Sequence, residues 1–351
     1  MLRTLSLKNI RGFANAKIGL EPLTVFVGTN GSGKTTILEC ADAACRSSQA
    51  RRRFNPQASQ KIFTGRLAPT SLITRGSASA EIFAETESAR LRLDVEPNQV
   101  RRGESEGELP RSMILRLVPE KLAAPSYLTD AEPELAGDGG RLASVLDYLI
   151  GLRDGSIEKI EEDLRAIIPQ ARRLRVLPHV IESETIEDLD DNPAFESLRR
   201  VTTKHVGSRY ELDFGKMGFI PASDLSEGTL IAIGILTVIH SAASPTLALF
   251  DDLDRGLHPT AQTDLIKTLR ELVEQRGDLQ IMCTTHSSYA LDAFSAAEAH
   301  VTWMDENGVG YHRRLSEHPE WPRWESVMDA GEFWSTVGER WVGESDPQES
   351  A

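Results

Sequence analysis

The chain has 351 residues, of which 40% are hydrophobic and 26% are charged, as is typical of a soluble globular protein of about two domains. Its formal net charge of -14 argues against a generally basic surface that binds nucleic acid, but it is compatible with a local basic patch. The odd set Cys40, Cys45 and Cys283 argues against a disulfide scaffold and indicates small buried side chains in a reducing cytosol.

No segment has the composition of a secretory signal or a membrane helix. The N-terminus, MLRTLSLKNIRGF, lacks the apolar core of a signal sequence. The longest apolar run, 230–239, is half of the roughly 20 residues that a membrane helix requires. We therefore expect a cytoplasmic protein that does not bind membranes.

The N-terminal part of the chain is predicted to be mostly β-structure around one helix. Residues 2–8 alternate between apolar and polar side chains and 16–20 are short and apolar, so both are expected as strands. The continuous run Leu23–Val27 (LTVFV) is typical of a fully buried strand. A glycine-rich loop follows, then a helix over about 35–45, and the alternation over 81–95 predicts a hairpin.

The middle of the chain is more polar and partly helical. Residues 96–110 are predicted to form a mobile loop, and 113–118 one more strand. Apolar spacing over 141–168 predicts helices that are interrupted by glycine. Residues 182–191 hold six acids and are predicted to be a solvated loop, before another strand at 209–214.

From residue 224 onward, helical and buried-strand patterns alternate, which predicts a parallel sheet with crossover helices. The whole pattern predicts an α/β fold with an N-terminal antiparallel β portion, a core parallel sheet and a helical insert. The predicted division is a first lobe at 1–95, an insert at 96–215, a second segment of that lobe at 216–320 and a tryptophan-rich tail at 321–351.

The segment GTNGSGKTT, which begins at Gly28, matches the phosphate-loop pattern G-x-x-x-x-G-K-[ST] between a predicted strand and a helix. Glycines let backbone N–H groups curl around phosphates, and the helix N-terminus favours an anion. Lys34 is expected to reach the β- and γ-phosphates, and the Thr35 hydroxyl to ligate Mg²⁺. The residues predicted to bind ATP here are Asn30, Gly31, Ser32, Gly33, Lys34, Thr35 and Thr36.

The predicted strand Thr246–Phe250 delivers two acids, Asp251 and Asp252, to its carboxyl end. Ligands bind at that end of the strands in open α/β sheets. We predict that Asp251 holds Mg²⁺ and that Asp252 polarises the attacking water as a base.

A third buried strand, 280–284 (QIMCT), leads to Thr285 and His286. A histidine at this place can contact the γ-phosphate and respond to its hydrolysis. Lys34, Asp252 and His286 are therefore the predicted catalytic residues.

Four motifs together resemble the ABC-type ATPase heads of the SMC/RecF/OLD group. They are the phosphate loop, the segment Leu225–Thr229 (LSEGT) that opens a helix, the acidic motif DDLDRGLHP that begins at Asp251, and TTHS at 284–287. The opening LSLKNIRGF is also similar to the start of such heads. The resemblance is closest to compact AAA-like members without coiled-coil arms, and its motifs cover 2–40 and 224–290.

The resemblance implies a P-loop NTPase fold with ABC/SMC-head architecture, in which 1–95 and 216–320 are the two segments of the ATPase. It also implies Mg²⁺-dependent ATP hydrolysis in a two-fold homodimer. In such heads the Ser-x-Gly segment of one subunit closes on the ATP that the other binds, which assigns this role to Ser226 and Gly228. A hydroxyl and a helix N-terminus are donors suited to a γ-phosphate. Arg11 lies in the Asn-x-Arg turn that approaches the nucleotide in these families, and it is predicted to contact ATP.

The chain departs from the family pattern at the nucleotide site. Asp252 stands where these heads usually carry glutamate, and a misplacement of about 1 Å can cost about a hundredfold in rate, so we expect slow turnover. The glutamine that often contacts Mg²⁺ has three candidates, Gln49, Gln57 and Gln60, between which the sequence does not decide. LSEGT in place of LSGGQ argues against a transporter subunit.

No effector domain is recognisable, and we expect too few residues after His286 for a Toprim nuclease domain. The head is therefore predicted to gate a separate effector protein, a nuclease or toxin, in a bacterial anti-phage or toxin-like defence system. The alternative is a RecF-like, ATP-dependent DNA-binding clamp in repair.

Two segments are candidate partner sites. Residues 43–80 contain seven Arg and Lys and no acid, so they are either a surface for nucleic acid or an acidic protein, or a solvated insert. Four of the five tryptophans lie at 321–341, where they either anchor an interface or pack on the chain's own core.

Overall fold

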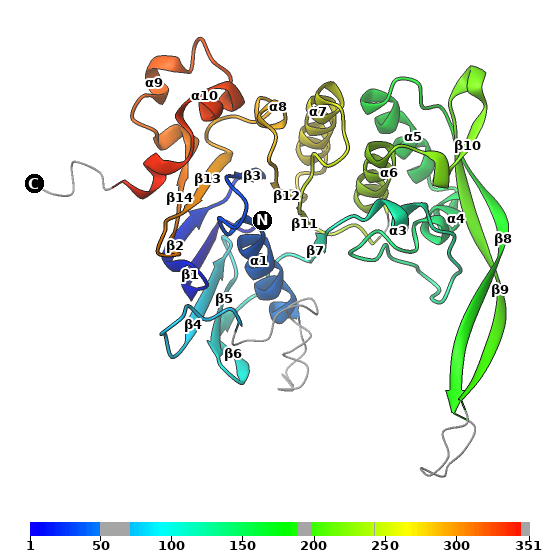
Figure 1. The fold of residues 1–351 in the computed structure, drawn as a ribbon, viewed down its shortest axis with the longest axis horizontal. Coiled ribbons are helices and arrows are strands. Elements are labelled where there is room, and N and C mark those ends of the chain that lie inside the picture. Colours follow the sequence, from blue (N-terminus) through cyan, green and yellow to red (C-terminus); the bar gives the residue numbers. More distant parts are fainter. Residues whose placement is uncertain (50–70, 189–197, 242, 345–351) are drawn as a thin grey trace, which may run out of the picture. The chain divides into compact units, whose positions relative to one another are not determined.

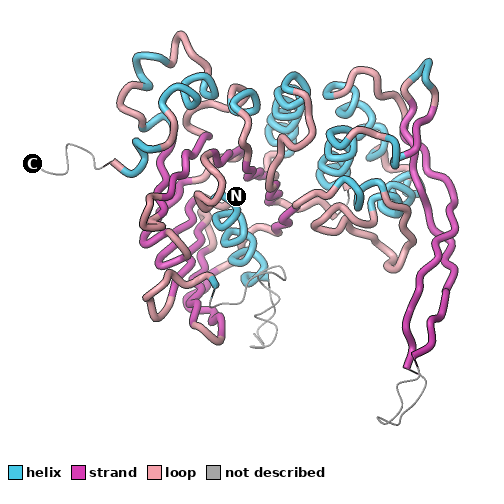
Figure 2. Tube along the Cα trace, viewed as in Figure 1, coloured by secondary structure: helices cyan, strands magenta, loops and turns pink. Residues whose placement is uncertain are grey.

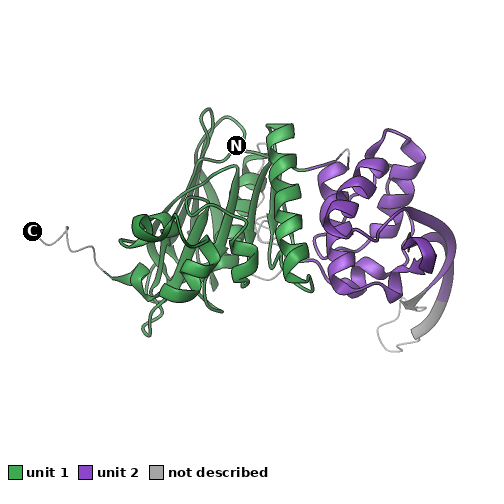
Figure 3. Cartoon of the chain, turned by 90° about the horizontal axis from the view of Figure 1, so that it is seen from above, with its two compact units in different colours: residues 1–116, 245–351 green, residues 117–244 purple. Residues whose placement is uncertain are grey.

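The computed structural model describes residues 1–49, 71–188, 198–241 and 243–344. The chain forms two compact units, coloured separately in Figure 3. Unit 1 comprises 1–116 and 245–351, and unit 2 comprises 117–244. In the described residues, no helix combines the length and apolar character needed to cross a bilayer.

The first sheet of unit 1 is antiparallel, with the strand order β2-β1-β4-β5-β6. Its strands are β1 (Thr4–Ile10), β2 (Phe13–Gly19), β4 (Ala80–Glu85), β5 (Arg90–Glu96) and β6 (Gln99–Glu106). It confirms the predicted N-terminal antiparallel portion. The prediction of a loop over 96–110 is wrong for residues 99–106, which form β6 and pair with β5. After Val100 most side chains of β6 are exposed, so the strand lacks the apolar alternation that would mark it in the sequence.

The second sheet of unit 1 has the order β14-β13-β3-β12-β11-β7, in which only the β13–β14 pair is antiparallel. Its strands are β3 (Leu23–Val27), β7 (Ser112–Leu115), β11 (Leu247–Phe250), β12 (Gln280–Thr284), β13 (Ala299–Met304) and β14 (Gly310–Arg314). Every residue of β3, β11 and β12 is buried, which explains why their sequences are mostly apolar and do not alternate with exposed polar residues. The parallel core sheet was thus predicted correctly.

Helix α1 (Lys34–Gln49) packs against both sheets of unit 1, because it contacts β4 and β5 on one side and β7 and β12 on the other (Figures 1 and 2). Thirteen of its sixteen residues are buried as a result. The three cysteines, two of them on α1, are buried and free, as predicted. The other α-helices among the described residues of unit 1 are α7 (Pro259–Arg276), α8 (Ser288–Leu291), α9 (Trp321–Trp324) and α10 (Ala330–Val337).

Unit 2 consists of helices and one long β-ribbon. The helices are α3 (Pro119–Ala123), α4 (Leu142–Leu152), α5 (Ser156–Ile167) and α6 (Glu227–His240). The ribbon pairs β8 (Leu174–Asp188) with β9 (Leu198–Asp213), and β10 (Phe219–Pro221) extends it beside β9. The helical insert was predicted, with α4 and α5 falling within 141–168.

The acidic loop predicted over 182–191 is wrong as far as residue 188, because those residues continue β8; 189–191 lie outside the described residues. The strand predicted at 209–214 is only the last part of β9. Val180 and Val206 pair across the ribbon and are 56% and 81% exposed, so the ribbon has no buried face there. A two-stranded element that buries neither face lacks the alternation from which strands are predicted.

The tryptophans near the C-terminus mostly pack within unit 1. Trp321 meets the Phe333 ring edge-on at 5.1 Å, and Trp341 is buried and contacts the His318 ring at 4.8 Å. Trp324 is 41% exposed. Of the two alternatives for this segment, packing on the chain's own core therefore holds for Trp321 and Trp341.

Candidate functional site

The loop between β3 and α1 has a backbone that depends on glycine. Gly28 and Gly33 have φ angles of +143° and +98°. A Cβ atom on Gly28 would lie 2.1 Å from the carbonyl oxygen of Thr302, and one on Gly33 would lie 2.6 Å from Cε2 of Phe13. Neither position therefore tolerates a side chain, which leaves the backbone N–H groups of the loop unshielded for an anion.

Lys34 begins α1 and folds back over the loop. Its Nζ donates to the carbonyl oxygens of Gly28 at 2.8 Å and Thr29 at 2.9 Å. Burial lowers the pKa of Lys34, and the neighbouring carboxylates, led by Asp252, oppose that effect. Within the part of the chain that the structure describes, the ammonium hydrogen-bonds neutral carbonyls and forms no ion pair, so it has no carboxylate partner there to give up when an anion binds.

A cavity of about 270 Å³ opens over this loop. Its lining contains most of the residues that the sequence predicted to bind the nucleotide. They come from the turn after β1, the phosphate loop, α1 and the segments that follow β11 and β12. The lining residues are Arg11, Gly12, Phe13, Asn30, Gly31, Gly33, Lys34, Thr35, Thr36, Asp252, His286 and Met304. Ser32 does not line it, because its hydroxyl hydrogen-bonds the hydroxyl of Thr302 at 2.6 Å in the buried layer beneath.

The Thr35 hydroxyl donates to Asp251, with distances of 2.9 and 3.0 Å to its two carboxylate oxygens. The Thr284 hydroxyl donates to Asp251 Oδ1 at 2.9 Å. These residues follow three neighbouring strands, β3, β12 and β11, whose carboxyl ends share one sheet edge. A cluster of one carboxylate and two hydroxyls is the oxygen donor set that Mg²⁺ prefers, so these residues fit the metal.

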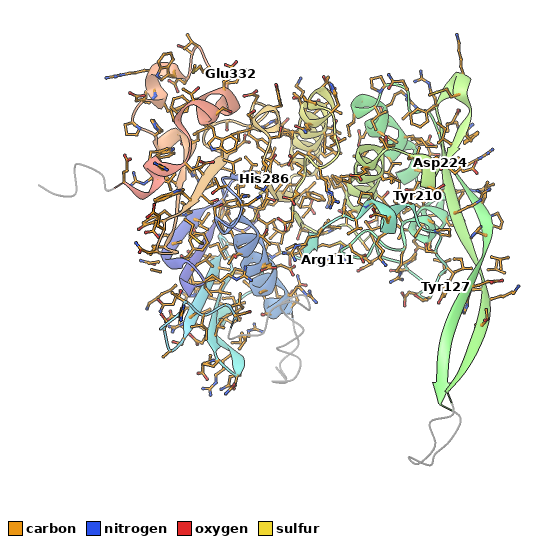
Figure 4. All side chains as sticks on the ribbon, in the orientation of Figure 1. Arg111, Tyr127, Tyr210, Asp224, His286 and Glu332 are labelled. Carbon is orange, nitrogen blue, oxygen red and sulfur yellow. The ribbon has the colours of Figure 1, made fainter. Side chains whose placement is uncertain are left out.

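Asp252 and His286 face each other across the cavity, with 3.9 Å between Asp252 Oδ1 and His286 Nε2. This distance is too long for a hydrogen bond. Burial raises the pKa of Asp252, and the charge of Asp251 adds to the increase. Asp252 has a φ angle of +60°, and its N–H donates to the Thr284 hydroxyl at 2.8 Å. His286 follows β12 and is labelled in Figure 4.

Arg11 lies in the turn between β1 and β2 and lines the cavity. Its Nη1 donates to the Thr36 hydroxyl at 2.6 Å and lies 3.8 Å from Oε2 of Glu39. The guanidinium is therefore positioned beside the start of α1, as a nucleotide contact would require.

Two residues of the site were missed by sequence reasoning, Arg116 and Glu39. Arg116 follows β7, and its Nε donates to Asp251 Oδ2 at 2.9 Å while its Nη2 donates to Glu39 Oε1 at 2.5 Å. Glu39 lies on α1 and is buried. Arg116 has no recognisable motif around it, and only the position of β7 beside β11 brings it to the site.

Ser226 and Gly228 belong to unit 2 and lie at the start of α6. Ser226 is the N-cap of this helix, and its hydroxyl accepts from the Thr229 N–H at 3.3 Å. The helix therefore begins where the LSEGT motif predicts.

The glutamine candidates and the basic segment are only partly described. Gln49 ends α1, about 22 Å along the helix axis from Lys34, which is too far for a shared metal. Gln57 and Gln60 lie outside the described residues, as do Arg51, Arg52, Arg53, Lys61 and Arg66 of the predicted nucleic-acid surface at 43–80.

Comparison with protein families gives one match over most of the chain. A family model described as "AAA domain, putative AbiEii toxin, Type IV TA system" matches residues 23–292. Among curated proteins, the DNA replication and repair protein RecF of Nocardioides sp. is 26% identical over 178 residues, or 48% of this chain. The matched part spans 38% of that RecF protein.

Solved structures show the fold. The chain is similar to an Smc head bound to the C-winged helix domain of ScpA, with 14% identity, 90% of this chain and 99% of that chain covered, and a TM-score of 0.59. It is also similar to the Pyrococcus furiosus Smc head domain with an extended coiled coil, bound to the C-terminal domain of ScpA, with 12% identity, 93% and 99% coverage and a TM-score of 0.54. The predicted SMC-head architecture is confirmed.

Proposed function

The chain belongs to this AAA-domain family and is an ATPase head of the ABC/SMC/RecF type, and we propose that it binds and slowly hydrolyses ATP with Mg²⁺ to gate a separate effector. The carrying observation is the hydrogen bond between Thr35 and Asp251 at 2.9 Å. It joins the phosphate loop to the acidic strand end, 216 residues later in the chain, beside a cavity that Lys34 also lines.

In this proposal Thr35 and Asp251 hold Mg²⁺, which would screen the charge of the phosphates. Lys34 and the N–H groups of the loop hold the β- and γ-phosphates, and Arg11 contacts the nucleotide from the β1–β2 turn. Asp252 accepts a proton from the attacking water, and His286 orients the γ-phosphate or the water opposite it. All of these groups except Asp251 line the same cavity.

We further propose that the site is completed by a second copy, whose Ser226 and Gly228 close on the γ-phosphate. The Ser226 hydroxyl and the first N–H groups of α6 are donors of the required kind. A two-fold dimer then holds two equal sites, each built from both copies.

Mixing two inactive variants tests the shared site. Lys34→Met removes the phosphate contact, and Ser226→Asp keeps an N-cap acceptor while placing a carboxylate where the partner's γ-phosphate binds. Each variant alone is expected to be inactive, whereas an equal mixture recovers about a quarter of wild-type turnover, since half the dimers carry one intact site. ATPase rates of the single and mixed samples check this. A mixture as inactive as its components would contradict the shared site.

The effector proposal draws on the family description, which names a toxin system, and on the two Smc heads, each of which is bound to a separate protein. Its test is the native mass and composition of the tagged chain from its source cells, with and without ATP and Mg²⁺. A heavier, ATP-dependent assembly with a second polypeptide is expected. A bare ATP-dependent homodimer would instead favour the second candidate below.

The second candidate is a RecF-like DNA-binding clamp, which the 26% identity to RecF favours. It requires DNA binding that depends on ATP and weakens steeply with salt. The same purified chain can be titrated with duplex DNA at two salt concentrations, so the two candidates are separated with one preparation.

A further inference from the structure

Arg116 lies beside Asp251, the carboxylate of the proposed metal site. It ends the first segment of unit 1, 1–116, and directly follows β7, which pairs in parallel with β11 so that Leu115 lies opposite Phe250. The next residues of these two strands are therefore Arg116 and Asp251, and the Asp251 N–H donates to the carbonyl oxygen of Leu115 at 2.9 Å. This register fixes the arginine beside the aspartate.

Asp251 is satisfied without a metal. Its Oδ1 accepts from the hydroxyls of Thr35 and Thr284, and its Oδ2 accepts from Thr35 and from Arg116 Nε. The hydroxyls are neutral, so the guanidinium is the positive charge that directly balances this carboxylate, whose side chain is 10% exposed. A divalent cation on Asp251 would lie close to that guanidinium, and like charges at such distances repel strongly in a partly buried site.

Arg116 has a second carboxylate within reach. Glu39 is 7% exposed, accepts from Arg116 Nη2 at 2.5 Å through Oε1, and has no hydrogen-bond partner for Oε2 in the described part of the chain. Arg11 Nη1 lies 3.8 Å from Oε2, beyond hydrogen-bond distance, so Glu39 can hold the guanidinium of Arg116 when Asp251 is engaged elsewhere. The guanidinium can therefore take two positions. In the bridging position it contacts both Asp251 and Glu39, and in the retracted position it contacts Glu39 alone.

We propose that Arg116 is a resident counter-cation that competes with Mg²⁺ for Asp251 and retracts onto Glu39 when the metal binds with nucleotide. This inference rests on the proposed Mg²⁺·ATP function of the site. Its consequence is a metal site that stays closed to free Mg²⁺, because only the added negative charge of the phosphates makes exchange of the guanidinium for the metal favourable.

Two substitutions should move the metal requirement in opposite directions. Arg116→Gln removes the competitor and is expected to lower the half-saturating Mg²⁺ concentration roughly tenfold, as loss of one charge-assisted hydrogen bond predicts. Glu39→Gln removes the retracted position, leaves the guanidinium on Asp251, and is expected to raise that concentration by about the same factor. Arg116→Lys keeps the charge but not the planar group that contacts Asp251 and Glu39 through two nitrogens, so its midpoint should lie between those of wild type and Arg116→Gln.

The experiment follows the fluorescence of N-methylanthraniloyl-ATP bound to the full chain, first in EDTA and then across a Mg²⁺ titration. Arg270→Gln is a matched control, because Arg270 is 33% exposed against 28% for Arg116 and pairs with Glu298 at 2.6 Å, away from the cavity lining. Binding in EDTA should be unchanged in Arg270→Gln, and also in the Arg116 variants, because Arg116 is absent from the cavity lining and contacts the proposed metal ligand. Glu39→Gln is judged by its Mg²⁺ midpoint alone, because Glu39 also lies 3.8 Å from Arg11, a proposed nucleotide contact. Thermal melting of each variant verifies folding, and Glu39→Gln keeps the inference testable if Arg116→Gln does not fold.

Three results would overturn the inference. An unchanged or raised Mg²⁺ midpoint in Arg116→Gln would mean that the arginine orients Asp251 for the metal and does not compete with it. Weaker binding in EDTA would make Arg116 a phosphate contact. A lowered midpoint in Glu39→Gln would exclude retraction. If wild-type protein bound no nucleotide in EDTA or Mg²⁺, the proposed function itself would fail, and that result differs from all three.

Discussion

Replacing Asp252 with asparagine is expected to reduce ATP turnover by about 10²- to 10³-fold, as loss of a general base does, with ATP affinity changed less than about threefold. Asparagine keeps the size of the side chain and adopts left-handed backbone conformations as readily as aspartate, so the φ angle of +60° is preserved. What is lost is the carboxylate that faces His286 across the cavity. ATP hydrolysis under saturating substrate and fluorescent-nucleotide binding measure the two effects separately.

The control for this variant is Asp278→Asn. Asp278 is 58% exposed and pairs with Arg276, whereas Asp252 is 57% exposed and lies opposite His286, so both are surface aspartates beside a basic group. Asp278 lies outside the cavity lining and its change should leave turnover intact. If Asp252→Asn kept more than half of the wild-type rate, the base would have to be another group, and His286 would be the next residue to replace.

The sheet order explains how residues distant in sequence form one site. Strand β12 lies between β3 and β11, so Thr284 at its end reaches Asp251 from the side on which the phosphate loop begins. The Asp252 N–H is held by the same Thr284 hydroxyl that bonds Asp251. Both acids are therefore positioned by the last residue of the strand that leads to His286, and a change at Thr284 would disturb all three.

Sequence patterns predicted the parts of the site that are encoded locally. A buried strand is a continuous apolar run, and a phosphate loop needs glycines at fixed spacing, so Leu23–Val27 and the loop that follows could be placed without a structure. The order of strand and helix patterns predicted the antiparallel portion, the parallel core and the insert. The likeness of the motifs to ABC-type heads then assigned these parts to one architecture, which the structural neighbours confirm.

What sequence reasoning missed depends on contacts between distant strands. Nothing around Arg116 marks it, because its role comes from β7 lying beside β11 with a defined register. Glu39 sits in the middle of α1, where an acid usually faces water, and it is buried only because α1 packs between two sheets. The β8–β9 ribbon escaped prediction for a related reason, since the exposed pair Val180 and Val206 gives no alternation.

Lys34→Met should weaken ATP binding by more than about a hundredfold, since it deletes a charged hydrogen-bond donor to the phosphates from a partly desolvated loop. The side chain is 6% exposed, and methionine fills the same space without the ammonium. Among the described residues, the wild-type ammonium donates to the carbonyls of Gly28 and Thr29. Two hydrogen bonds to a charged group contribute about 3–6 kcal/mol before the desolvation of the ammonium is subtracted, which sets the upper limit on the loss of folding stability.

Fluorescent-nucleotide titration in EDTA is the decisive measurement for Lys34→Met, because it separates the phosphate contact from the metal. Loss of binding without Mg²⁺ in this variant, beside unchanged EDTA binding in Arg116→Gln, would assign the two cations to different partners. If Lys34→Met still bound the nucleotide with near wild-type affinity, the loop's N–H groups alone would carry the phosphates. The Lys34 ammonium would then serve to hold the loop closed through Gly28 and Thr29.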